Sequence, residues 1–208
     1  MSQFFVIHPE NPQKRLIQQA VSILQEGGVI VYPTDSSYAF GCLIGMKDAM
    51  ERIRRIRQLD DKHDFTLICR DLSDLSTYAK VENTAYRLLK AFTPGPYTFV
   101  LRATKEVPRR LQHPKKKTIG LRVPDNQIAL ELIEAVGEPI LTTTAQLPED
   151  DMPLMDPYEF RDFLENQVDL IIDGGYGEPT ETSVIDLSED DPVVVREGKG
   201  DVSHFNNL

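Results

Sequence analysis

Hydroxyl-bearing residues gather where apolar stretches of this sequence end. The run Val29–Tyr32 leads through a proline into the segment Thr-Asp-Ser-Ser at 34–37, and another apolar run leads into three threonines at 142–144. Thr98 follows a Pro-Gly-Pro turn, and Thr182 opens a late apolar run. Hydroxyl and backbone N–H groups suit phosphate oxygens and small zwitterions, and open α/β sheets bind ligands beyond the carboxyl ends of their strands. The pattern predicts a polar-ligand site, although capped turns would use the same residues.

Four arginines are the cationic counterparts of these hydroxyls. Arg55 and Arg57 lie late in an expected helix, and since positions i and i+2 diverge on a helix, both can face one ligand only if the helix ends there. Arg122 and Arg196 lie within apolar runs, where an unpaired charge is costly. Each is therefore either a ligand of a phosphate or carboxylate group or half of a structural ion pair.

Other kinds of site find little support in the sequence. The four histidines lie far apart and form no HExxH or other paired metal motif. Neither a GxSxG elbow nor a Walker GxxxxGK(S/T) loop occurs. We therefore expect no metal ion held by the protein alone.

Strands and helices alternate early in the chain, and strands cluster late. Helical spacing of apolar residues, with cap and turn residues at the ends, predicts helices over 11–28, 47–59, 84–91, 127–136 and 157–167. Short apolar runs predict strands over 4–7, 29–32, 65–69, 97–102, 118–123, 140–144, 170–173, 182–187 and 193–196. This order favours one α/β domain with a mixed sheet and helices packed on it.

Composition is that of an ordinary globular protein: 208 residues, 40% hydrophobic and 27% charged. The N-terminal residues do not show the basic region followed by an apolar region that is typical of an export signal, and no apolar run is long enough for a membrane span. We therefore expect a cytoplasmic protein, in which both cysteines are free thiols. Residues 1–122 hold 20 Lys and Arg against 12 Asp and Glu, and residues 123–208 hold 3 against 21. The asymmetry indicates an anion-attracting surface, unless the fold interleaves the two parts.

Together these segments resemble the YrdC-like family, whose best-known members are threonylcarbamoyl-AMP synthases of tRNA modification. The resemblance rests on segments that follow the family's order: Pro33–Gly41, Arg55-Ile56-Arg57, Pro94–Thr98, Ile119–Pro124, Thr143–Gln146, Thr182–Asp186 and Arg196–Gly198. The YciO-type branch is the most similar. The resemblance implies one YrdC-like domain over 1–208, with a core of about 13–198. It also implies a twisted, open, mostly parallel sheet of the YrdC/RibB-like kind, with a concave, positively charged cavity.

The resemblance further implies a function. Such a protein would bind nucleotide and RNA and would join L-threonine, bicarbonate and ATP into threonylcarbamoyl-AMP, with Mg²⁺ accompanying the nucleotide. The family positions imply substrate binding by Thr34, Tyr38 and Arg122. They imply nucleotide binding by Arg55, Arg57, Thr98, Thr144, Gln146, Thr182 and Arg196.

Several departures from the family pattern concern ligand contacts rather than the core. Arg55 replaces a lysine, Asp35 replaces a glutamate, and Thr144-Ala145-Gln146 replaces Ser-Ala-Asn. Two alternatives to a synthase therefore stay open: a module that binds double-stranded RNA or tRNA, and a nucleotide-binding protein without synthase activity. No membrane partner is expected.

Overall fold

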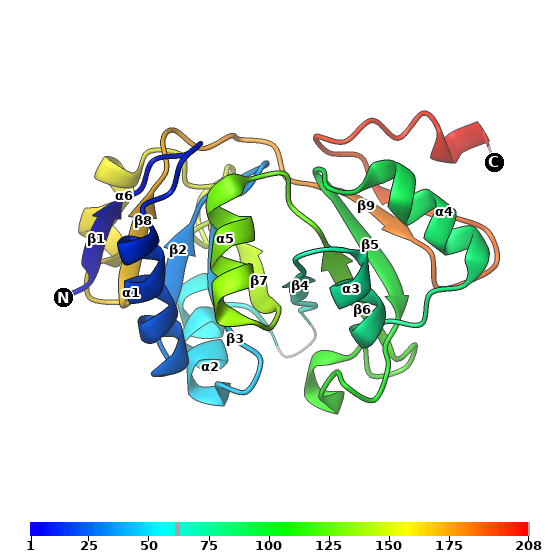
Figure 1. The fold of residues 1–208 in the computed structure, drawn as a ribbon, viewed down its shortest axis with the longest axis horizontal. Coiled ribbons are helices and arrows are strands. Elements are labelled where there is room, and N and C mark those ends of the chain that lie inside the picture. Colours follow the sequence, from blue (N-terminus) through cyan, green and yellow to red (C-terminus); the bar gives the residue numbers. More distant parts are fainter. Residues whose placement is uncertain (61–62, 208) are drawn as a thin grey trace.

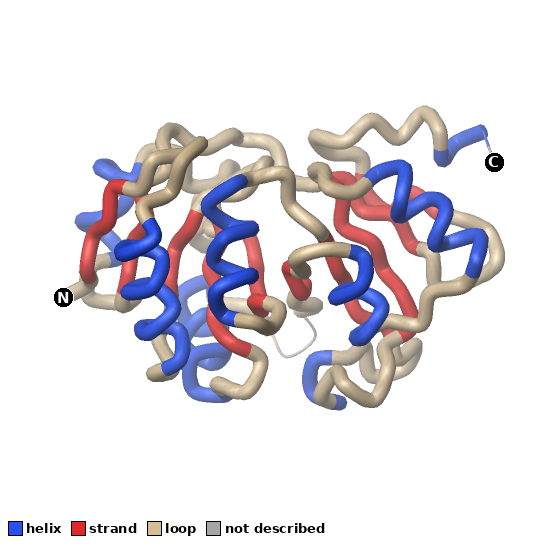
Figure 2. Tube along the Cα trace, viewed as in Figure 1, coloured by secondary structure: helices blue, strands red, loops and turns tan. Residues whose placement is uncertain are grey.

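The protein, described here from a computed structural model, is built on one twisted mixed sheet (Figures 1 and 2). The structure describes residues 1–60 and 63–207. Within them, the ten strands are ordered β1-β8-β2-β3-β7-β4-β6-β5-β9-β10. The strand bounds are β1 Gln3–Val6, β2 Ile30–Tyr32, β3 Ala39–Leu43, β4 Thr66–Ile68, β5 Tyr97–Arg102, β6 Thr118–Arg122, β7 Ile140–Thr144, β8 Leu170–Asp173, β9 Ser183–Asp186 and β10 Val193–Arg196.

Six α-helices accompany the sheet in the described residues. They are α1 Lys14–Gln25, α2 Lys47–Arg57, α3 Leu72–Tyr78, α4 Asn83–Phe92, α5 Gln127–Val136 and α6 Pro157–Leu164, with short 3₁₀ turns at Arg109–Leu111 and Phe205–Asn207. The predicted α/β class and mixed sheet are confirmed. The helix and strand ranges agree with prediction to within a few residues, except that β3 and α3 were not predicted.

The expectation of a mostly parallel sheet is wrong. Among the described strands, five of the nine pairings are antiparallel, including β2 with β3 and β3 with β7. The short link 33–38 between β2 and β3 is the physical reason for the first of these, because a parallel return needs a crossover of a dozen or more residues.

The first half of the sheet (β1, β8, β2, β3 and β7) is covered on both faces. Ile30 and Tyr32 pack in one hydrophobic cluster with α1 and α5, whereas Val29 and Val31 belong to the other cluster, with α2 and α6. Figure 1 shows α1 and α5 side by side in front of these strands. Burial on both faces explains why β2 and residues 170–172 of β8 are apolar at every position.

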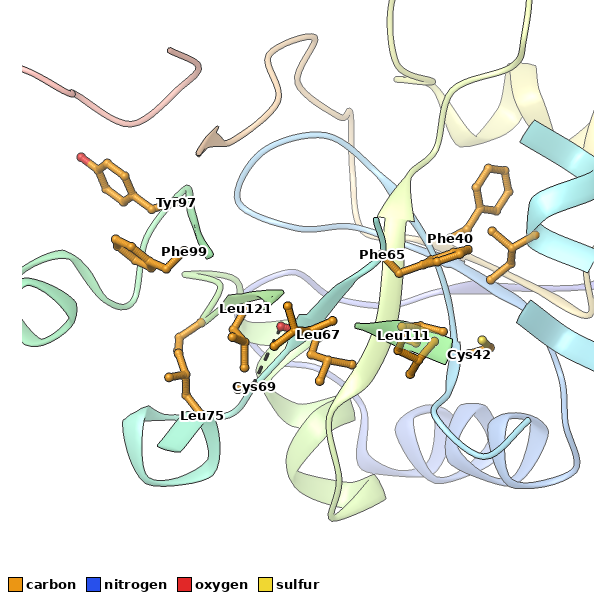
Figure 3. Packing of buried hydrophobic residues seen from close by; sticks show 14 of the residues in the cluster. Phe40, Cys42, Phe65, Leu67, Cys69, Leu75, Tyr97, Phe99, Leu111 and Leu121 are labelled. Atoms are coloured by element: carbon orange, nitrogen blue, oxygen red, sulfur yellow. Dashed lines mark hydrogen bonds between the residues drawn. The ribbon is translucent and has the colours of Figure 1, made fainter. Parts of the chain in front are cut away.

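The second half of the sheet (β4, β6, β5, β9 and β10) buries one face against α3 and α4. In β4, β5, β6 and β9 the odd-numbered apolar residues join the core, and Figure 3 shows Phe99 and Leu121 near Leu75 of α3. Leu89 of α4 belongs to the same cluster. Each such side chain contributes about 1.5–3 kcal/mol when it is fully buried. The even-numbered residues of β5, β6 and β9, with Thr66 of β4, face the other way, and several of them line the site described next.

Candidate functional site

A cavity of about 330 Å³ lies on the uncovered face of the second half of the sheet. Alternate residues of neighbouring strands form its floor: Thr98 and Val100 of β5, Thr118, Gly120 and Arg122 of β6, and Thr66 of β4. The first half contributes Thr142 and Thr144 of β7 and the serines at 36 and 37. Segments far apart in the sequence therefore meet at one hollow, whose volume is in the range of small-ligand sites.

Gly120 keeps the middle of this floor open. A Cβ atom at this position would lie 3.1 Å from Oγ1 of Thr66 and 3.3 Å from Cγ2 of Thr98. Both distances are tighter than ordinary van der Waals contact. Glycine therefore lets the neighbouring threonines converge and leaves space above the sheet.

Arg122 is buried at one end of the cavity and forms an ion pair with Asp35. Its Nη1 donates to Oγ of Ser36 at 3.3 Å, and Asp35 Oδ2 accepts from the backbone N–H of Asp125 at 2.9 Å. Burial lowers the pKa of Arg122, and Asp35 opposes that effect. Among the described residues, Nε of Arg122 has no hydrogen-bond partner. The ion pair with Asp35 and the bond to Ser36 thus account for both Nη groups of Arg122, whereas its buried Nε–H group has no partner among the described residues.

Arg57 reaches the cavity from the end of α2. The helix stops because Gln58 adopts a left-handed conformation, with φ of 53°. Arg57 Nη1 donates to Oγ1 of Thr143 at 2.7 Å, and its Nε donates to the carbonyl of Gln146 at 3.1 Å. In the same wall, His63 Nε2 lies 3.2 Å from the Thr143 hydroxyl. Burial, and then the charge of Arg57, lower the pKa of His63, so the neutral imidazole is favoured here.

Arg196 of β10 also lines the cavity. Its Nε and Nη2 donate to the carbonyl of Thr182 at 3.0 and 2.8 Å, and Nη1 donates to Oε2 of Glu181 at 3.0 Å. The Thr182 hydroxyl lies 2.8 Å from that of Thr98, which joins the starts of β5 and β9. The cation and both hydroxyls are thereby held in fixed relative positions.

The structure brings together six of the ten predicted site residues. Arg57, Thr98, Arg122, Thr144, Thr182 and Arg196 line the cavity. Arg55 is exposed on α2 and lies outside the lining, as do Thr34, Tyr38 and Gln146. Their assigned roles stay predictions.

Three of the residues outside the lining have clear structural contacts. Thr34 donates from Oγ1 to the carbonyl of Ser37 at 2.6 Å and so shapes the turn that carries both serines. The Tyr38 hydroxyl donates to the carbonyl of Gly175 at 2.6 Å, and burial raises its pKa. The Gln146 side chain donates to the carbonyl of Asp150 at 2.7 Å.

Sequence reasoning missed several lining residues, notably His63, Thr66, Thr118 and Glu181. For the threonines a signal existed: in β5 and β6, polar or small residues alternate with Phe99, Ile119 and Leu121 at period two. The charged lining groups are three arginines opposed by Asp64 and Glu181. In the described part of the chain, no group of three His, Cys, Asp or Glu could hold a metal ion.

Fold and cavity together define a class: α/β proteins with a twisted mixed sheet and an open hollow of hydroxyl and guanidinium groups on one face. The chain belongs to the Sua5/YciO/YrdC family, since the family model described as "Telomere recombination" matches residues 22–198. The predicted family membership is thereby confirmed. Among the residues described, no helix is both long and apolar enough to cross a membrane.

The YciO protein of Escherichia coli (strain K12) is 64% identical over 205 residues, which cover 99% of this chain and 100% of that protein. Its crystal structure matches with a TM-score of 0.95, again over 99% of this chain and 100% of that one. These values confirm the similarity to the YciO-type branch.

Named synthases are more distant. Threonylcarbamoyl-AMP synthase of Vibrio vulnificus (strain YJ016) is 31% identical over 134 residues, 63% of this chain and 72% of that protein. The crystal structure of P. abyssi Sua5 complexed with L-threonine matches with a TM-score of 0.90 at 26% identity, over 99% of this chain and 60% of that chain.

Proposed function

We propose that this protein binds ATP and L-threonine in the cavity and catalyses a threonylcarbamoyl-AMP synthase-type adenylyl transfer. The observation that carries the proposal is the convergence of Arg57, Arg122 and Arg196, from three separate elements, on one hollow lined with hydroxyl groups. The L-threonine complex of P. abyssi Sua5, which shares this fold over almost the whole chain, supports the choice of amino acid. The proposed biological setting is modification of tRNA in the cytoplasm.

The cavity supplies the groups that such a reaction needs. Adenylyl transfer spreads negative charge over phosphate oxygens, so fixed cations and hydrogen-bond donors provide most of the stabilisation. Arg57 and Arg196 are held by backbone carbonyls, Gln146 in one case and Thr182 in the other. They are therefore pre-positioned for the triphosphate, and Thr98, Thr144 and Thr182 would contact the nucleotide beside them.

The amino acid would lie at the Arg122 end of the cavity. The buried Nε of Arg122 and the hydroxyls of Ser36 and Ser37 are polar groups suited to a carboxylate and a side-chain hydroxyl. The amino nitrogen of threonine would condense with bicarbonate, with loss of water, to give a carbamate. A carbamate oxygen would then attack the α-phosphorus of ATP, and pyrophosphate would leave.

Mg²⁺ would enter with the nucleotide, held by phosphate oxygens and water, and would neutralise part of the charge of the leaving pyrophosphate. Of the residues that the structure describes, Asp64 and Glu181 are the carboxylates in the lining, which agrees with a metal ion borne by the substrate. The residues of the chain would bind and orient the two substrates and exclude water from the labile carbamate.

Incubation of the purified protein with ATP, Mg²⁺, L-threonine and radiolabelled bicarbonate tests the proposal. The expected products are labelled threonylcarbamoyl-AMP and one equivalent of pyrophosphate, with both absent when threonine is omitted. Binding of ATP without formation of either product would contradict the synthase activity. It would instead support the alternative of a nucleotide-binding protein that acts on another substrate.

A further inference from the structure

A carboxylate lies among the arginines of the cavity. Glu181, the second residue before β9, lines the cavity together with Arg57 and Arg196. Its Oε2 accepts a hydrogen bond from Nη1 of Arg196 at 3.0 Å. Burial lowers the pKa of Arg57, and the charge of Glu181 opposes that effect. One carboxylate therefore acts on both guanidinium groups that we assign to the triphosphate.

Each of the three guanidinium nitrogens of Arg196 donates at least one hydrogen bond. Nε and Nη2 bind the carbonyl of Thr182, and Nη1 binds Glu181. The bonds to the Thr182 carbonyl hold Nε and Nη2, so Nη1 is the guanidinium nitrogen left to face a ligand in the cavity. Glu181 therefore occupies the direction in which Arg196 can offer a charged hydrogen bond to a ligand.

The backbone of Glu181 cannot retreat from this position. Its carbonyl accepts from the backbone N–H of Lys199 at 2.9 Å. A Cβ atom at Gly198 would lie 2.5 Å from the same carbonyl oxygen, so two segments touch here with no space between them. The side chain of Glu181 is 32% exposed, however, and it can rotate toward solvent while its backbone stays fixed.

We infer that Glu181 is an internal counter-ion that occupies the place of a ligand's anionic group and rotates away when a polyphosphate binds. The inference rests on the proposed function, since it concerns the same anion subsite. Glu181 pairs with Arg196 and its charge also acts on Arg57, so it offsets the positive charge of both groups when no anionic ligand is bound.

The same exchange selects among ligands. A ligand that offers a single carboxylate replaces one negative charge by another and gains little at Arg196. A di- or polyphosphate brings more charge than the carboxylate it displaces, so it gains attraction to both arginines. Glu181 is thus a specificity-determining residue that favours polyphosphates over monocarboxylates at this end of the cavity.

Calorimetric titration of the full chain with inorganic pyrophosphate, and separately with ATP and Mg²⁺, tests this inference. Glu181→Gln keeps the shape of the side chain and removes the charge, and it is expected to bind pyrophosphate about 5- to 20-fold more tightly than the unmodified chain. Glu178→Gln is the matched control. Glu178 lies on the same segment but pairs with Lys199 and does not line the cavity, so its affinity should stay within about twofold.

The outcomes separate the inference from the proposed function. Equal or weaker pyrophosphate binding by Glu181→Gln, with measurable binding by the unmodified chain, would overturn the counter-ion role and leave the nucleotide site standing. Weaker binding of ATP with Mg²⁺ alone would make Glu181 a partner of the metal-bound substrate, which also overturns it. Failure of all three proteins to bind either anion would overturn the proposed function as well.

Discussion

Arg55 and Arg57 are two positions apart on helix α2 and yet lie in different surroundings. Arg55 is exposed, whereas Arg57 is half-buried and bound to Thr143 and Gln146 inside the cavity wall. The sequence motif predicted that both arginines bind the nucleotide, because residue spacing alone does not show where the helix ends or which side of it faces the cavity. The left-handed Gln58 ends the helix so that only the last arginine enters the cavity.

This difference gives a paired test at the residue scale. Arg57→Ala removes a charge-assisted donor and is expected to weaken ATP binding about 10- to 100-fold, with little change in the melting temperature. Arg55→Ala is expected to change ATP affinity less than about twofold. Titration calorimetry and thermal unfolding of both variants provide the measurement. Equal losses of affinity would place Arg55 at the ligand and contradict the geometry.

His63 predicts a pH dependence of stability. In the unfolded chain a histidine gains its proton near pH 6.5, whereas in the folded protein burial and Arg57, which outweigh Asp64 and Asp60, lower the pKa of His63. The unfolded state therefore binds more protons as the pH falls below about 6.5, and the free energy of unfolding decreases there. Above that pH the effect is absent.

Urea unfolding of the native chain and of His63→Asn between pH 7.5 and 5.0 measures this effect. The unmodified chain should lose stability more steeply than the variant as the pH falls, because the variant has no proton to take up at this position. Parallel curves would show that the folded structure does not resist protonation of His63.

At the scale of elements, patterns of apolar residues predicted the long helices and most strands. Helix α5 and strands β5, β7, β8 and β10 were placed with the correct bounds, since their apolar runs begin and end at turn residues. Strand β3 was missed because Ala39–Leu43 follows the hydroxyl-rich turn directly and contains a glycine. Thr98 and Arg122 of the cavity floor were predicted, but Thr66, Thr118 and Gly120 were missed because the alternation along the strands was read for burial and not for the polar or small residues on the opposite face.

Gly198, which follows β10, lies directly against the backbone of Glu181 and Thr182 at the start of β9. Substitution by alanine would place Cβ 2.5 Å from the backbone oxygens of both Glu181 and Thr182. We expect Gly198→Ala to lower the free energy of unfolding by about 1–3 kcal/mol. It should also weaken ATP binding, because the start of β9 and Arg196 would be pushed apart.

Gly45 provides the control for this substitution. A Cβ there meets nothing within 4 Å, so Gly45→Ala should change stability by less than about 0.5 kcal/mol. Denaturant unfolding of the two variants makes the comparison. A Gly198→Ala protein as stable as the native chain would show that β9 and the segment after β10 can separate at little cost.

At the scale of the whole molecule, the basic N-terminal part and the acidic C-terminal part of the sequence do not fold as two separate units. Strand β8 lies between β1 and β2, and β7 lies between β3 and β4, so acidic C-terminal segments are inserted among basic N-terminal ones. Charge counts along a chain cannot anticipate such interleaving. Two arginines of α2 also bind within the chain: Arg52 pairs with Asp169, and Arg54 donates to the carbonyl of Asp60.

The RNA-binding alternative depends on a basic surface formed by the exposed residues Arg109 and Lys115–Lys117. If this surface binds duplex RNA, affinity should fall steeply with salt, and Lys115→Glu with Lys116→Glu should reduce the slope of log K against log salt by about two. ATP affinity should be unchanged, since neither lysine lines the cavity. Filter binding over 50–200 mM salt is the measurement. An unaltered slope in the double variant would show that duplex RNA does not bind at these lysines.

The chain passes between the two halves of the sheet three times, from β3 to β4, from β6 to β7 and from β8 to β9. During synthesis, β2 can therefore pair with β8, and β5 with β9, only after at least 80 intervening residues have been made. Pairings between such remote segments form slowly compared with local helices. Assembly of the sheet is thus expected to be a late event that follows translation of most of the chain, and the nascent apolar strands would need protection from aggregation until then.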